Sequence, residues 1–308
     1  MELSKEETEL VICYIGENEK DMIPLTLDSV SEADYIIYID GGSTDGSQKI
    51  LKDSGFTEFD SEEWVGADLK EHKRILINRR FEHEHPGANG RARNFYLEVL
   101  NEKFMGAWCL VLDPDEIVDS IEELRRDISY GVLDDYDIYN VKMRHMIANL
   151  SEEDFTIGEH HVPGRLFKVQ EGITYSEIEH PVLQHPNIKA YPDYNRICIW
   201  HLSYARNIFP LRKRYLNHLK KSTIHSKEFL RWWYISHLLG TYPKRRFDPR
   251  ELPLTLKKAF EIDDDEIYFA ERRNLETKHF LDAFQWKEYF NPINALDVGC
   301  GLGQRVFT

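Results

Sequence analysis

The sequence predicts an α/β fold in which a mostly parallel sheet is covered by helices. Short apolar runs typical of buried strands alternate with helical stretches in the first third of the chain. The best-defined apolar runs stop abruptly at polar or glycine-rich turns. In open α/β sheets such turns meet at the carboxyl ends of the strands, where ligands bind, so the predicted architecture and the polar clusters agree.

Four apolar, mostly β-branched runs predict the first strands, at 9–15, 35–39, 74–78 and 108–112. The spacing of apolar residues between them predicts helices at 21–29, 48–54 and 91–101. Shorter strand-like runs follow at 139–144, 165–169 and 196–200, which we interpret as the second half of the same domain. Further helices are predicted at 211–224, 228–239 and 253–260, with Pro243 and Pro249 marking breaks.

This pattern predicts three parts. Residues 1–205 form the α/β domain, and residues 206–290 form a basic helical appendage or linker. Residues 291–308 include Ala295-Leu296-Asp297-Val298-Gly299-Cys300-Gly301-Leu302-Gly303, which resembles the strand and glycine-rich turn that open S-adenosylmethionine-dependent methyltransferases. We expect a fusion to such a domain, the alternative being a chance glycine-rich tail.

Composition narrows the class of protein. At 308 residues with 42% hydrophobic content, the chain can bury a large core. No stretch is apolar for long enough to span a bilayer, and the start lacks a signal-peptide pattern, so we expect a cytoplasmic protein. The scattered cysteines Cys13, Cys109, Cys198 and Cys300 predict free thiols, not a zinc site.

Charge is unevenly distributed. The net charge is −15, yet residues 196–258 hold 15 Lys and Arg against three Asp and Glu, which leaves about −27 for the rest. This block is either a solvated helical face or a surface for an anionic partner, such as a phosphorylated acceptor or the inner face of a membrane. Nucleic acid is not expected as a partner, because the acidic remainder would repel phosphates. The aromatic run 232–234 within the block is either core or an acceptor or membrane contact.

The strongest chemical motif is Asp113-Pro114-Asp115-Glu116, directly after the fourth predicted strand. Two carboxylates one residue apart at a strand end suit Mg²⁺ or Mn²⁺. Such a cation neutralises a diphosphate that leaves from a nucleotide sugar. Asp115 is our first choice as ligand; the alternative is that these acidic residues only begin a helix.

A second polar turn, Asp40-Gly41-Gly42-Ser43-Thr44-Asp45-Gly46-Ser47, follows the second predicted strand. It supplies Asp40 and Asp45 for a base or ribose, or is an ordinary glycine-rich turn with a helix cap. Arg91 and Arg93 begin a later helix, where guanidinium groups suit diphosphate oxygens; surface salt bridges are the alternative.

These motifs, in this order, resemble the family 2 glycosyltransferases over roughly residues 9–205. That family has a Rossmann-like GT-A fold with an Asp-(Asp/Ser)-Gly-Ser-x-Asp-Gly turn, a glycine-containing loop with Ala-Arg-Asn, and a later Asp-x-Asp. Gly41 departs from the pattern, since many members have Asp there. The resemblance implies a hexosyltransferase that uses a nucleoside diphosphate sugar and Mn²⁺ or Mg²⁺.

The resemblance also implies site residues. The donor site would contain Glu17, Asp40, Gly42, Ser43, Asp45, Arg91, Arg93, Asn94 and Asp113. The metal would be held by Asp113, Asp115 and His201, although a structural role for His201 is an equal alternative.

Among the subgroups, the chain is most similar to the lipopolysaccharide-core β-glucosyltransferase-like branch, through Asp113–Glu116, Arg165–Lys168 and Tyr175–Leu183. His180 matches the histidine of that branch, but Pro181 replaces the glutamate after it. An inverting transfer needs a carboxylate to take the proton of the acceptor hydroxyl, so Glu179, and after it Glu177, are the candidate bases.

The sequence therefore predicts sugar transfer to a glycan or lipid-linked acceptor. A nucleotidyltransferase is less favoured, because the expected Gly-rich, Lys- or Arg-bearing loop after the first strand is missing. The non-enzyme alternative is a degenerate nucleotide- or glycan-binding scaffold of a bifunctional transferase and methyltransferase polypeptide, favoured by Pro181.

Overall fold

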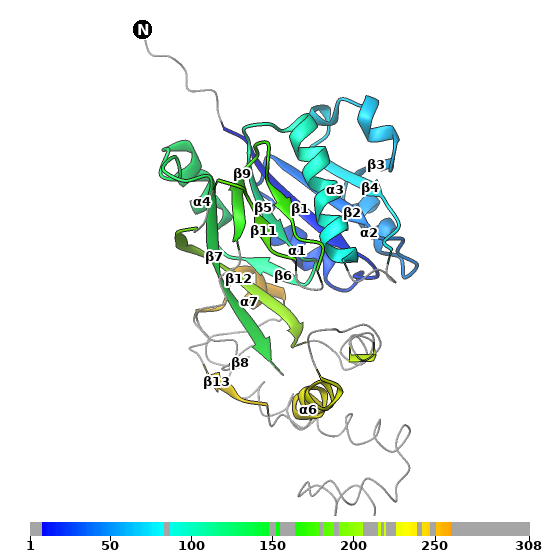
Figure 1. Cartoon of the computed structure of the whole chain (residues 1–308), viewed down its shortest axis with the longest axis vertical. Helices are drawn as coiled ribbons and strands as arrows, with labels where there is room; N and C mark the ends of the chain where they lie inside the picture. The colour runs from blue at the N-terminus through cyan, green and yellow to red at the C-terminus, as the bar shows by residue number, and fades with distance from the viewer. Residues whose placement is uncertain are drawn as a thin grey trace, which may run out of the picture.

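The computed structural model describes residues 8–82, 87–147, 152–154, 164–178, 181–187, 191–205, 215–216, 219, 226–238, 242–246 and 251–259. The described part of the chain contains an 11-stranded sheet and a separate two-stranded ribbon (Figure 1). The main path through the sheet is β13-β8-β7-β9-β5-β1-β2-β4-β3, with β12 and β6 joined beside β7.

One half of the sheet is entirely parallel. Its strands, in spatial order, are β3 (Thr57–Asp60), β4 (Arg74–Asn78), β2 (Tyr35–Asp40), β1 (Leu10–Gly16) and β5 (Trp108–Leu112). The predicted α/β class with a parallel, helix-covered sheet is confirmed. The predicted strands at 74–78 and 108–112 match β4 and β5 residue for residue, whereas β3 was not predicted.

Helices cover both faces of these strands. Alternate residues of a strand point to opposite faces, so each strand contributes side chains to both layers of packing. Leu10, Ile12 and Tyr14 pack with the helices on one face, which are α1 (Ile23–Ser29), α2 (Ser47–Asp53) and α4 (Ile121–Ser129). Val11 and Cys13 pack on the other face against α3 (Ala88–Lys103), which crosses the parallel strands in Figure 1. The sheet is thus the middle layer of three.

Antiparallel strands extend the sheet beyond β5. β9 (Gly164–Lys168) pairs antiparallel with β5 and with β7 (Ile138–Ile147). β12 (Asp193–Tyr204) runs parallel to β7 and antiparallel to the short strand β6 (Glu116–Val118). β12 therefore lies between β6 and β7, beside the turn that follows β5.

Smaller elements border the parallel strands. β10 (Thr174–Tyr175) and β11 (Leu183–Gln184) form the two-stranded ribbon. Two short 3₁₀ helices, η1 (Glu63–Gly66) and η2 (Leu69–Glu71), precede β4. Trp64 of η1 packs edge-on against Phe95 of α3, with ring centroids 5.9 Å apart.

Two segments of the basic region, at β13 (Lys244–Arg246) and α7 (Leu254–Ala259), pack on the sheet domain. β8 (Glu152–Asp154) pairs with β13, which sets a basic strand against an acidic one, and Lys244 Nζ lies 2.6 Å from Glu152. Leu252 lies just before α7 and Leu256 lies within it. Both pack into a core cluster with Met22, which precedes α1, and with residues of β6 and β12.

Another helix described in this region is α6 (Lys227–Leu238), close to the predicted 228–239. Most of the predicted helix 211–224 and all of residues 291–308 lie outside the described residues. No helix in the described ranges is long and apolar enough to cross a membrane.

Candidate functional site

The candidate site lies where β1, β2 and β5 end. Gly16 is the register partner of Asp40, and Tyr14 pairs with Leu112, so the turns after these strands meet. Gly16 allows the closest approach: a Cβ there would lie 2.5 Å from Cγ of Pro114 and 2.2 Å from the Tyr38 hydroxyl. Any side chain at position 16 would push away the turn that carries the acidic motif.

The turn after β1 is bound to the turn after β2. The amide of Asn18 donates to Ser43 Oγ at 2.8 Å, and Thr44 N donates to Asn18 Oδ1 at 2.8 Å. Asn18 has a φ of 60°, a left-handed conformation that asparagine tolerates better than most residues. Glu17, beside it, is partly exposed at the rim of this paired turn.

Asp40 is fully buried and organises its own turn. Its carboxylate accepts hydrogen bonds from the amides of Gly42 and Ser43, from Ser43 Oγ and from Gln48 Nε2, at 2.5–3.0 Å. The two oxygens are therefore already engaged, and Asp40, with Gly42 and Ser43, shapes the loop.

Asp45 binds the first residue of helix α2, whose N-cap residue is Gly46. Its Oδ1 accepts from Ser47 N at 2.9 Å and from Ser47 Oγ, and its Oδ2 accepts from Lys20 N at 3.2 Å. Partial burial raises the pKa of Asp45, but the hydrogen bonds from Ser47 and Lys20 outweigh it, so the pKa falls below its usual value. Asp45 thus holds the turn against the first residue of α2, whereas the N-cap position makes no side-chain cap hydrogen bond.

Gly41, which stands where many members of the resembled family have Asp, packs closely against Phe81. A Cβ at position 41 would lie 2.3 Å from Cδ2 of Phe81. The Phe81 ring therefore fills the space that an acidic side chain at position 41 would need.

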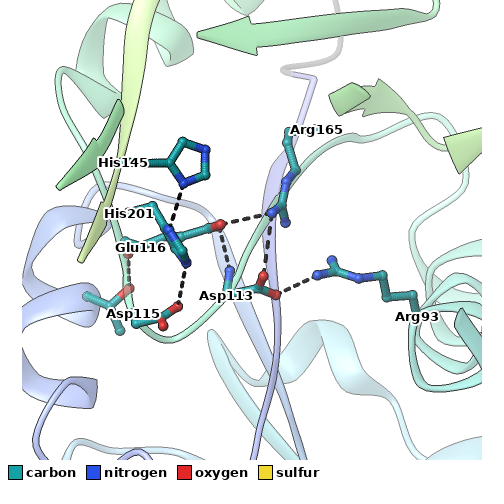
Figure 2. Close-up of polar contacts among 8 residues, drawn as sticks. Arg93, Asp113, Asp115, Glu116, His145, Arg165 and His201 are labelled. Carbon is teal, nitrogen blue, oxygen red and sulfur yellow. Dashed lines mark hydrogen bonds and ion pairs between the residues drawn. The ribbon is translucent and has the colours of Figure 1, made fainter. Parts of the chain in front are cut away.

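The start of α3 supplies a buried cation. Arg93 Nη2 lies 2.6 Å from Asp113 Oδ1, and the Arg93 side chain is only 9% exposed, against 30% for Asp113 (Figure 2). The guanidinium also lies 5.6 Å from the Tyr175 ring centroid. Burial alone would lower the pKa of Arg93, but Asp113 raises it well above its usual value.

The other two predicted residues of this helix are differently placed. Arg91 is exposed and pairs with Glu82 at 2.7 Å and with Glu177 at 3.1 Å. Asn94 makes a reciprocal pair with the backbone of Tyr175, in which its Nδ2 donates to the carbonyl at 3.0 Å and its Oδ1 accepts from the amide at 2.7 Å. Asn94 thus joins α3 to β10. Gly90 permits this contact, because a Cβ there would lie 2.3 Å from Ser176 O.

Glu116 and Arg165 hold the acidic motif in place through hydrogen bonds and ion pairs with Asp113. Glu116 Oε2 accepts from the Asp113 amide at 2.7 Å, and its Oε1 accepts from Arg165 Nη2 at 2.8 Å. The same Nη2 lies 3.4 Å from Asp113 Oδ2. In Figure 2, Arg165 approaches the Asp113 carboxylate from above and Arg93 approaches it from the right.

The pKa values of the Asp113 and Glu116 carboxyls are shifted in opposite directions. Burial raises the pKa of Asp113, but Arg93 and Arg165 outweigh it and hold the pKa below its usual value. Burial raises the pKa of Glu116 to about 8; Arg165 opposes this, while Asp113 and Asp115 add to it. Asp113 therefore carries the more stable negative charge.

Asp115 faces a histidine of β12, the strand that pairs with β6 beside the acidic turn. His201 Nε2 lies 3.8 Å from Asp115 Oδ1, and both side chains are largely buried. His201 Nδ1 in turn lies 3.0 Å from Nδ1 of His145 on β7 (Figure 2). Within the described ranges, no three His, Cys, Asp or Glu side chains are arranged to hold a metal ion by themselves.

The structure thus brings Asp113, Asp115 and His201 to one place, with Asp113 turned towards two arginines. Of the candidate bases, Glu177 is half-exposed and bound to Arg91. Glu179 and His180 lie outside the described residues.

Sequence reasoning missed Glu116, Arg165 and His145 as members of the cluster. Glu116 and Arg165 stand within stretches that the family resemblance covers, and their charge next to strand ends is the signal that points to them. His145 has no motif around it, and its place follows only from the pairing of β7 with β12.

The alignments of this chain with the known structures below cover less than half of it. No family model and no curated protein matches the chain. Solved structures of glucosyl-3-phosphoglycerate synthase from Mycobacterium tuberculosis do match. The complex with phosphoglyceric acid has 20% identity and a TM-score of 0.30, and the complex with Mn²⁺ and UDP-glucose has 21% identity and a TM-score of 0.31. Each alignment covers 46% of this chain and 45% of that chain, a likeness too distant to assign an activity.

Proposed function

We propose that this chain is a metal-dependent glycosyltransferase of the GT-A type, which transfers a sugar from a nucleoside diphosphate sugar to a glycan or lipid-linked acceptor. The observation that carries the proposal is the meeting of three polar turns at the carboxyl ends of β1, β2 and β5, with Arg93, Arg165 and His201 converging on the acidic turn. Ligands of open α/β sheets bind at this edge.

A diphosphate fits the charges beside the acidic turn. Two buried guanidinium groups flank Asp113, and Nη1 of Arg165 is a buried donor that lacks a hydrogen-bond partner in the described part of the chain. An unsatisfied buried donor costs about 1–3 kcal/mol, so an anionic oxygen placed there would be stabilising. Asp40 and Asp45 then contribute to donor binding indirectly, by fixing the shape of the turn after β2. Glu17 lies partly exposed at the edge of this site.

A divalent cation fits between Asp115 and His201. Their O···N separation of 3.8 Å is too long for a hydrogen bond. Two ligand atoms each about 2.1 Å from one ion are separated by roughly 3.0–4.2 Å, so the pair has room to share Mn²⁺ or Mg²⁺. Such ions are commonly held by one or two protein groups, with substrate phosphates and water completing the shell. When bound, the cation supplies charge that stabilises the departing diphosphate.

The remaining chemistry belongs to the chain's own side chains. In an inverting transfer the acceptor oxygen attacks the anomeric carbon, the bond to the diphosphate oxygen breaks, and a carboxylate takes the hydroxyl proton. We propose Glu179 for this carboxylate, with Glu177 as second choice. Arg91 binds Glu177 and so links this segment to the start of α3.

A panel of nucleoside diphosphates tests the donor site. Thermal unfolding is measured with ADP, CDP, GDP, UDP and dTDP, each with Mn²⁺, with Mg²⁺ and with chelator, on wild type and Asp115→Asn. We expect one nucleotide to raise the Tm of wild type only with metal, because binding to the native state alone stabilises it. The increase should vanish in Asp115→Asn.

Asp53→Asn is the matched control, since Asp53 is exposed on α2 and loses the same charge away from the site. It should keep the full response. Stabilisation that persists with chelator would remove the metal from the proposal, and no response to any nucleotide would favour the scaffold alternative.

A further inference from the structure

His145 and His201 form a histidine pair behind the candidate metal site. They are register partners on the parallel strands β7 and β12, with Nδ1 atoms 3.0 Å apart and ring planes inclined by 75° (Figure 2). The opposite nitrogen of His201, Nε2, faces Asp115. His145 therefore contacts His201 on the side away from Asp115.

The contact between two Nδ1 atoms constrains the protons. A neutral imidazole carries one proton, so in an Nδ1···Nδ1 hydrogen bond one ring donates and the other accepts. A histidine that ligates a metal through Nε2 must keep that nitrogen unprotonated. His201 would then carry its proton on Nδ1 and donate it, and His145 would accept at Nδ1 and carry its own proton on Nε2.

We propose that His145 is a positioning residue that selects the metal-ligating tautomer of His201. The inference rests on the proposed function, because it concerns the same cation. Without an acceptor at position 145, the Nδ1–H of the largely buried His201 would lose this partner, and the tautomer with its proton on Nε2, facing the Asp115 carboxylate, would be favoured. That tautomer has no lone pair for a cation. Hydrogen bonds to the far nitrogen of metal-bound histidines act in this way in general.

The test measures Mn²⁺ affinity, by the electron paramagnetic resonance signal of free Mn²⁺, in the presence of an excess of the nucleoside diphosphate that the panel selects. His145→Phe keeps a ring but removes the acceptor, and we expect the Kd for Mn²⁺ to rise about 10–100-fold. His145→Asn places a carbonyl oxygen near the position of Nδ1 and should stay within about threefold of wild type. Met143→Ala, a buried core residue on the same strand, controls for loosened packing and should lower the Tm but leave the Kd unchanged.

A double-mutant cycle separates positioning from general damage. If His145 acts through His201, His145→Phe should weaken Mn²⁺ binding no further in a His201→Ala background. Unchanged affinity in His145→Phe, full additivity with His201→Ala, or equal losses in Phe and Asn variants would each overturn the inference alone. Wild type that binds no Mn²⁺ with any nucleotide would overturn the proposed function, and the inference with it.

Discussion

Arg93 and Asp113 form an ion pair in which Nη2 lies 2.6 Å from Oδ1, at the junction of α3 with the turn after β5. The arginine is buried, whereas the carboxylate keeps partial contact with solvent. Arg165 approaches the other carboxylate oxygen, so the first residue of the Asp-Pro-Asp motif is bound on both sides. The pair therefore sets the orientation of the acidic turn, and it can be tested by stability as well as by binding.

Replacing Arg93 by Met should destabilise the fold. Removing one member of a buried ion pair costs about 3–5 kcal/mol, and because Asp113 is partly hydrated we expect about 2–3 kcal/mol. Urea unfolding measures the change. Arg126→Met is the control, because its pair with Glu123 is exposed and should be worth less than about 1 kcal/mol. Equal losses for the two variants would contradict a structural role for the Arg93–Asp113 pair.

Asn94→Ala should detach β10 from α3. The variant leaves the Tyr175 amide and carbonyl without their partner, at about 1–3 kcal/mol for each group that stays buried. Hydrogen exchange at the Tyr175 amide should accelerate, and Asn94→Asp, which keeps the acceptor, should protect that amide better than Ala does. If Asn94→Ala leaves exchange and stability unchanged but weakens nucleotide binding, Asn94 contacts the donor and does not act as a clamp.

Acid should remove the stabilisation that Asp45 provides. Its pKa is lower in the folded state than in the unfolded chain, because Ser47 and Lys20 donate hydrogen bonds to the carboxylate. The contribution is therefore fully present above the unfolded value of about 3.9 and is lost as the pH falls through the lower folded value. The difference in unfolding free energy between wild type and Asp45→Asn should shrink below about pH 4. A difference that stays constant between neutral and strongly acidic pH would contradict this account.

The parallel half of the fold could be predicted because its strands are long enough to show a pattern. β5 is apolar at every position and ends at Asp113, and β4 has an apolar centre, Ile75–Ile77, between Arg74 and Asn78. β6 was missed because it has three residues and begins with the buried Glu116, so acidic residues before 121–129 resembled the start of a helix. β3 alternates between half-buried and exposed positions, which gives a weak signal.

Residue types predicted which polar turns come together, but not the partner of each group. The sequence placed Asp40 among the donor ligands, yet its carboxylate is taken up by Gly42, Ser43 and Gln48. That outcome depends on the exact path of the turn, which composition does not determine. His145 lies 56 residues before His201, and only the register of β7 with β12 brings them together.

Release of nucleoside diphosphate from its matched nucleotide sugar, without acceptor, tests most directly whether this site performs sugar transfer. Water can replace the acceptor hydroxyl, so we predict slow release by wild type with Mn²⁺. Chelator or Asp115→Asn should reduce it by about 100-fold or more, since charge stabilisation of the leaving group is lost. Asp53→Asn should retain the wild-type rate. Tight, metal-dependent binding of the nucleotide with no release from any of the corresponding sugars would contradict the proposal and indicate a binding domain without transferase activity.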